Sequence, residues 1–305
     1  VAGGHASVTA NVSYSLQAPL TSASVGEAIG VAASKAALAN RVPKSLSREG
    51  DATALRTNLL RRNHDVWMTA TTDPEDIAPE AEISASSTLP TCSCETASRP
   101  IPASDGDVIC QFPVNTDSID TVSVLLDLEE EAELEATLLA GPVNGSTYPD
   151  QPLAEAKVVA PKERQQWVDF PFESKPARPG WHFLRITGNS SIAPYLSENA
   201  PVGAMRHVLR GGGIGPRNPY TDLQPVLPAA PGPASSLCFK IQPEQAVYEP
   251  ANVVQPETRP SHLPNLWISQ ATDFKYPEWI ELRWSERKKI ERVEIVFDPS
   301  LEYRF

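Results

Sequence analysis

The amino-acid sequence predicts a mainly β protein, an antiparallel β-sandwich preceded by an N-terminal α/β segment. Apolar and polar residues alternate through much of 122–138, which is the period of strands with one buried face. The chain also has 30 prolines and 16 glycines, which favour short strands and stiff connections. A run of small residues at 23–33 predicts a helix near the N-terminus.

The N-terminal segment combines one strand with this small-residue helix. The first seven residues are typical of a buried strand that enters a glycine turn at Gly3 and Gly4. The helix would place its smallest residues on one face, at Gly26, Gly30, Ala33 and Ala37. Such a face lets another backbone approach closely, and one strand with one helix cannot build a core alone. We therefore expect the segment to need a partner sheet.

The helix sequence resembles a motif of bacterial-type FAD-dependent oxidoreductases, Thr-Cys-x-x-x-Gly-Gln-Ala-Ala-Gly. The matching stretch here runs from Thr21 to Gly30, with Ser22 at the cysteine position and Glu27 at the glutamine position. Later stretches resemble the C-terminal region of the same family: Leu237-Cys238-Phe239, Asn265-Leu266-Trp267-Ile268-Ser269 and Trp279-Ile280-Glu281-Leu282. The resemblance implies that residues 1–78 are the end of a Rossmann-like FAD-binding domain.

The resemblance also implies a cofactor, FAD, and residues that contact it. The N-terminus of the small-residue helix would offer free backbone N–H groups to the electron-rich edge of the flavin ring. The implied cofactor-binding positions are Gly4, Ser7, Thr21, Ser22, Gly26 and Glu27. His5 follows the glycine turn, where ligands gather in α/β folds, and is the candidate catalytic residue. The ordinary alternative for His5 is that it caps the turn or fills space.

The strand–GxGxxG–helix unit that binds the FAD pyrophosphate in this family is missing from the sequence. The nearest candidate is Gly211 to Gly215, but Pro216 and Pro219 follow it and cannot open a helix. We therefore expect the isolated chain to hold no FAD. An N-terminal FAD-domain polypeptide, or a missing portion of the same protein, would complete the site.

Four parts follow from the change of pattern along the chain. The α/β segment is expected at 1–78, with a short amphipathic helix at 52–62. The antiparallel β-sandwich is expected at 79–210, with strands at 122–128, 132–138, 154–159, 166–172 and 181–187. A Pro/Gly-rich linker at 211–236 then leads to a partial galactose-binding-like sandwich at 237–305, with strands at 278–284 and 293–297.

Saccharide binding is a second function that the sequence supports. Alternation along 278–284 places Trp279, Glu281 and Arg283 on one face of a strand, and the other face would hold Ile280, Leu282 and Trp284. The Trp279 ring could stack on sugar C–H surfaces while the charged pair binds hydroxyl groups. The alternatives are that these aromatic residues are core, or that the chain is a non-catalytic glycan- or protein-binding sandwich protein.

The spacing of the cysteines and histidines matches no common metal-binding motif. Cys92 and Cys94 form a CxC pair, which is either a redox or metal pair or one half of a disulfide to Cys110, and we favour the disulfide. The five histidines are scattered and form no HxH or HxxxH pair, so no metal site is expected.

Net charge and hydropathy limit the classes of partner that the chain is expected to bind. The net charge of −12 argues against nucleic acid or an anionic membrane surface, and no apolar run is long enough to span a bilayer. Three potential N-glycosylation acceptors, Asn11, Asn144 and Asn189, are compatible with a secreted or periplasmic location.

Overall fold

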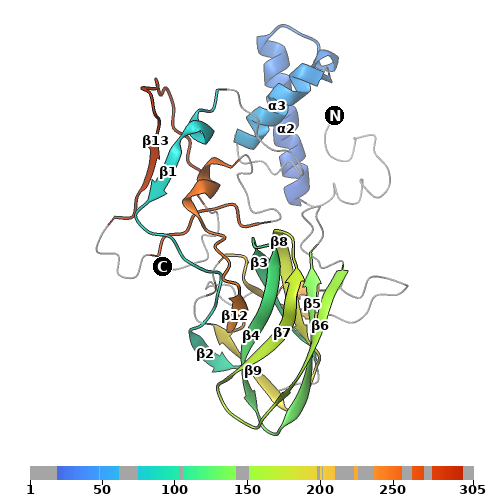
Figure 1. The fold of residues 1–305 in the computed structure, drawn as a ribbon. Helices are drawn as coiled ribbons and strands as arrows, with labels where there is room; N and C mark the ends of the chain where they lie inside the picture. The colour runs from blue at the N-terminus through green and yellow to red at the C-terminus, as the bar shows by residue number, and fades with distance from the viewer. Residues whose placement is uncertain are drawn as a thin grey trace. The chain divides into compact units, whose positions relative to one another are not determined.

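A computed structural model describes residues 19–47, 49–61, 75–102, 106–141, 151–197, 200, 202–209, 223–225, 236–255, 263–270 and 277–297 (Figure 1). The chain divides into two compact units, Val1–Asp76 and Ile77–Phe305. This division lies close to the domain boundary that the sequence predicts after residue 78. The predicted strand at residues 1–7 lies outside the described residues.

The first unit is helical where it is described. It contains α2 (Pro19–Leu38), the 3-10 helix η2 (Pro43–Ser47) and α3 (Glu49–Arg61). Pro19 opens α2 because its fixed φ suits a first helical position that needs no N–H partner. Asn40 ends the helix with a φ of 49°, and the N–H of Arg41 reaches back to the carbonyl of Ala36 at 2.9 Å. Both predicted helices are confirmed, and α2 is longer at both ends than expected.

The second unit is an antiparallel β-sandwich of two sheets (Figure 1). Six strands form one sheet, in the order β11 (Leu223–Pro225), β10 (Met205–Leu209), β3 (Val108–Val114), β8 (Gly180–Ile186), β5 (Ala132–Ala140) and β6 (Gln151–Ala160). Five strands form the other, with β12 (Phe239–Gln242), β4 (Ser118–Leu128), β9 (Ile192–Ser197) and β2 (Ala97–Pro100) in order and β7 (Gln166–Pro176) against β4. The mainly β, antiparallel class is confirmed.

The core lies between these two sheets. Alternate residues of β4 and β5 enter it: Val122, Val124, Leu126, Leu128, Leu134, Ala136 and Leu138. The ring of Phe112 on β3 packs against that of Phe239 on β12 with centroids 5.5 Å apart. The five predicted strands of the middle region all match observed strands, and the acidic run Glu129–Glu131 connects β4 to β5 as expected.

Two predicted segments differ from the structure because they pair within this sandwich. The predicted linker 211–236 contains β11, which pairs antiparallel with β10. Residues 237–242 were expected to open a separate sandwich, but β12 pairs antiparallel with β4 along Phe239–Gln242. Ladder hydrogen bonds and burial of Phe239 therefore join this segment to the middle sandwich.

A two-stranded ribbon completes the second unit. It consists of β1 (Glu82–Ala85) and β13 (Ile280–Arg283), paired antiparallel with Glu82 opposite Arg283. Two 3-10 helices, η3 (Ala78–Glu80) and η5 (Pro250–Val254), are the remaining short elements. The second strand predicted near the C-terminus, 293–297, pairs with no described strand.

Candidate functional site

The helix α2 carries those predicted cofactor-binding residues that the structure describes. Gly4, His5 and Ser7 lie outside the described residues. Thr21 and Ser22 lie in the first turn, Gly26 lies at the end of the second turn and Glu27 at the start of the third, and both Gly26 and Glu27 are exposed. We expected the helix to begin near residue 23, but it begins at Pro19. The N–H of Gly26 is therefore inside the helical ladder, and the N–H groups that the helix itself does not pair belong to its first turn, which includes Thr21.

One face of α2 is open. Gly26, Gly30, Ala33 and Ala37 recur at spacings of four, three and four, so they share a face, and all four are exposed. A Cβ added at Gly26 or Gly30 would meet no atom within 4 Å. Among the residues of α2 whose burial is described, Ala36 is the buried one, with 3% of its surface exposed. Within the described residues, nothing covers the small-residue face.

The start of α2 suits an electron-rich partner. No acidic residue lies in its first turn, so the positive end of the helix dipole is not neutralised there. Glu27 is exposed and lies about 100° around the helix axis from Gly26 but only about 60° from Gly30, so it stands at the edge of the small-residue face. The first-turn N–H groups and the Thr21 hydroxyl are donors of the kind that the anionic edge of a flavin ring would accept. These donors would suit an anionic or electron-rich group.

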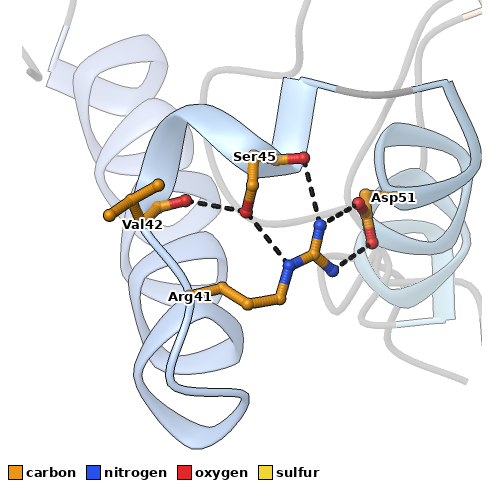
Figure 2. A network of polar contacts seen from close by, with 4 residues as sticks. All are labelled: Arg41, Val42, Ser45 and Asp51. Carbon is orange, nitrogen blue, oxygen red and sulfur yellow. Dashed lines mark hydrogen bonds and ion pairs between the residues drawn. The ribbon is translucent and has the colours of Figure 1, made fainter.

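An arginine clamp holds the end of α2 against η2 and α3 (Figure 2). The Nη1 and Nη2 atoms of Arg41 bind the two carboxylate oxygens of Asp51 at 2.9 and 2.5 Å. Its Nε donates to Ser45 Oγ at 3.1 Å, and Ser45 Oγ donates to the carbonyl of Val42 at 2.8 Å. The hydrogen bonds that Arg41 donates to the Asp51 carboxylate raise the pKa of Arg41. The clamp fixes the helix pair while the small-residue face stays open.

Of the predicted saccharide-binding residues, Glu281 and Arg283 lie on the exposed face of β13 and Trp279 directly precedes the strand, as alternation predicts. Trp279 is half exposed, and Glu281 and Arg283 are exposed and ion-paired at 2.7 Å. The opposite face is partly buried, and Trp284 on that side donates from Nε1 to the carbonyl of Ile77 at 2.8 Å. The face assignment from the sequence is confirmed.

Glu278 adds a group that sequence reasoning missed beside Trp279. Ser87 Oγ donates to Glu278 Oε2 at 2.7 Å, and Ser86 Oγ donates to the same oxygen. These hydrogen bonds lower the pKa of Glu278. The backbone N–H of Trp279 also donates to Ser86 Oγ at 2.9 Å, so the ring projects from a fixed backbone. No local signal could have found this contact, because the serines are about 190 residues away in sequence.

No protein-family model matches the chain, and no curated protein matches it. The function of the α2 face and of the Trp279 surface must therefore be inferred from their own residues. In the described part of the chain, no group of three or more His, Cys, Asp or Glu side chains is placed to hold a metal ion. No helix among the described residues is both long enough and apolar enough to cross a membrane.

The cysteines are buried thiols and not a disulfide. The structure has Cys92, Cys94, Cys110 and Cys238 all buried and unbridged, which corrects the expected disulfide to Cys110. Burial raises the pKa of Cys92 and that of Cys110 to about 12, and raises the pKa of Cys94 as well. Because the thiolate is the reactive form, the raised pKa values of Cys92, Cys94 and Cys110 disfavour their reaction at neutral pH, and all four cysteines pack in hydrophobic clusters.

Proposed function

We propose that this chain is the C-terminal part of an FAD-dependent oxidoreductase, in which α2 helps to close the flavin site and the β-sandwich is an accessory module. The observation that carries the proposal is the open small-residue face of α2. An exposed face of glycine and alanine suits the close approach of a second backbone. A helix face that only contacts water has no need for such small residues.

The partner would be an N-terminal FAD-domain polypeptide that carries the GxGxxG turn. A parallel sheet of the Rossmann type needs helices on both faces, so such a sheet offers a surface for α2 to cover. The approach of the sheet would bury Gly26, Gly30, Ala33 and Ala37 without a clash, since added atoms there meet open space. The clamp of Arg41 and Asp51 would hold α2 in place for this contact.

The residues of this chain would position the cofactor and not transform it. First-turn N–H groups and the Thr21 hydroxyl would donate hydrogen bonds to the ring edge, and the helix dipole would favour negative charge there. When bound, FAD would supply hydride acceptance from a substrate carbon. His5, which follows the glycine turn expected from the sequence, is the proposed catalytic residue.

The test measures flavin bound by the chain with and without an FAD-domain polypeptide of this family. We expect the purified chain alone to show no flavin absorbance and the complex to bind one flavin per pair. Replacing Gly30 with leucine should weaken the complex by more than about tenfold, because a buried branched side chain would hold the two backbones apart. Leucine is a better helix former than glycine, so α2 itself should persist, which circular dichroism can verify.

Ser24→Leu is the matched control. Ser24 is exposed on the opposite side of α2, so the same added side chain should leave complex formation unchanged. Stoichiometric flavin on the isolated chain, or equal effects of Gly30→Leu and Ser24→Leu, would contradict the proposal. Saccharide binding that Trp279→Ala abolishes, with no flavin acquired beside any FAD domain, would favour the glycan-binding alternative, which the half-exposed Trp279 supports.

A further inference from the structure

An unpaired segment follows the ribbon strand β13. Residues 287–297, here called the unpaired segment, are exposed throughout and belong to no sheet. No backbone hydrogen bond joins them to another described residue. Large apolar side chains in the segment are largely open to solvent: Ile290 at 51%, Val293 at 72%, Ile295 at 68%, Val296 at 46% and Phe297 at 78%. Several adjacent apolar residues exposed in this way are typical of an interaction surface.

The unpaired segment has the side-chain geometry of a β-strand. Lys289 pairs with Glu291 at 2.6 Å, and Arg292 pairs with Glu294 at 3.0 Å. Residues two apart lie on the same side of an extended strand but do not face each other on a helix. The segment is therefore extended, and its start is tethered by the ion pair of Lys288 with Glu80 at 2.6 Å.

An extended strand rich in valine and isoleucine gains most from a neighbouring strand. Its backbone N–H and C=O groups are then paired in a ladder, and its apolar side chains acquire cross-strand partners. Within the described residues the segment has no such neighbour, so the partner must come from elsewhere. The sequence of the segment indicates which partner fits.

We propose that the unpaired segment pairs antiparallel with the same segment of a second copy of this chain, in the register centred on Val293. In this register Arg292 of each copy lies opposite Glu294 of the other, so two opposite-charge pairs form by symmetry. On the same face Ile290 lies opposite Val296, again twice. The segment is therefore self-complementary in both charge and hydropathy on this face.

The other face adds apolar contact at the two-fold axis. Val293 lies opposite Val293 of the other copy, and Phe297 lies opposite Lys289, whose alkyl chain can cover the ring. Glu291 lies opposite Ile295 and keeps its ion pair with Lys289 in the same strand. The face thus buries three exposed apolar side chains of each copy, Val293, Ile295 and Phe297, without isolating a charge.

Neighbouring registers lack this match. A shift by one residue in one direction places Glu291 opposite Glu294, two like charges. Centring on Arg292 places Glu294 opposite Ile290, and centring on Glu294 places Arg292 opposite Val296. Register is therefore specified by the charges, and one two-fold arrangement is favoured over the others.

The predicted dimer is weak. One pair of strands about eight residues long buries less surface than the roughly 1,200 Å² at which stable interfaces begin. The dimer should therefore dissociate on dilution and should be visible only across a concentration series. Sedimentation velocity of the purified chain over that series measures its dissociation constant.

Charge reversal tests the register. Arg292→Glu and Glu294→Arg each place like charges opposite each other at both symmetric positions, so each should raise the dissociation constant by at least about tenfold. An equimolar mixture of the two variants restores opposite charges across every pair, as does the double variant Arg292→Glu/Glu294→Arg. Both should recover the dissociation constant of the wild-type chain.

Lys162→Glu is the control, because it reverses an exposed charge in the turn between β6 and β7. It should leave the dissociation constant unchanged. The proposal is overturned if the chain stays monomeric across the series, if assemblies grow beyond dimers, or if the single variants dimerise normally. It is also overturned if the variant mixture fails to recover the dimer, which would assign the segment to a different partner.

Discussion

Two buried histidines couple the stability of the β-sandwich to pH. His207 on β10 places Nε2 2.7 Å from Gln111 Oε1, and its Nδ1 has no hydrogen-bond partner. His182 on β8 places Nδ1 3.2 Å from the carbonyl of Gly180, and its Nε2 has no partner. Burial lowers the pKa of each imidazole to about 4. Both rings are therefore neutral in the folded protein at neutral pH.

Acid should destabilise the sandwich through these rings. An unfolded histidine binds a proton near pH 6.5, whereas His182 and His207 stay neutral in the fold down to about pH 4. The unfolded state then holds more protons between pH 6.5 and 4, so stability is full above this window and falls as pH falls through it. Each ring contributes a slope of up to about 1.4 kcal/mol per pH unit.

Replacing one histidine measures how much that residue contributes to the change of unfolding free energy with pH. His207→Gln keeps a side chain that can hydrogen-bond to Gln111 but cannot take up a proton in this window. Urea unfolding at pH 7, 6, 5 and 4 should show that the variant loses less stability on acidification than the wild-type chain. Parallel curves for the two proteins, or a His207 pKa near 6.5 by NMR, would contradict this expectation.

Among the secondary-structure elements, strands whose residues alternate between apolar and polar were predictable, and several strands without that period were missed. Along β5 and β7, buried residues alternate with less buried ones, and the sequence shows the same period. On β3, six consecutive residues from Ile109 to Val114 are buried, so the period of two is absent. The four-residue strand β12 is too short to show a period, which hid its pairing with β4.

For the candidate sites too, the residues that follow a local sequence pattern were predicted and those that depend on distant contacts were not. Alternation identified the exposed face of Trp279, Glu281 and Arg283, because that face depends on local period alone. The first-turn position of Thr21 was missed because the preference of proline for the start of a helix was not applied to Pro19. Glu278 and the clamp of Arg41 with Asp51 depend on contacts between side chains that no local pattern encodes.

The strand β12 should act as part of the sandwich and not of a separate domain. Phe239 is fully buried and packs against Phe112. Phe239→Ala should therefore destabilise the sandwich by about 3–5 kcal/mol, through lost burial and the cavity left behind. Urea unfolding followed by tryptophan fluorescence measures the loss, with Trp279→Ala as a control because that ring is half exposed.

An effect of Phe239→Ala confined to a minor transition, with the main unfolding midpoint unchanged, would assign β12 to an independent domain. A shift of the single main transition would assign it to the sandwich. The contrast with Trp279→Ala matters because both changes remove a large aromatic side chain, while only Phe239 lies between the sheets.

At the scale of the whole molecule, the two units differ in how much apolar surface they bury. Among the described residues of the first unit, the buried apolar side chains are Ala36, Leu59 and Leu60. The sandwich instead has a continuous core that draws on both of its sheets. Cooperative stability follows buried apolar surface, so the helices of the first unit should open far more readily than the sandwich.

Hydrogen exchange should reveal this difference directly. In the purified chain, we expect the amides of α2 and α3 to exchange at least about a hundredfold faster than the central amides of β4 and β8, because the helices have few buried contacts to lose on opening. Mass spectrometry of peptic fragments measures both regions in one sample, and the exposed ribbon β1–β13 is an internal reference for weakly buried strands. An FAD-domain polypeptide that covers the small-residue face should slow exchange in α2 and leave β4 unchanged. Equal protection of α2 and β4 in the chain alone would show that the first unit is stable by itself and has no need of a partner sheet.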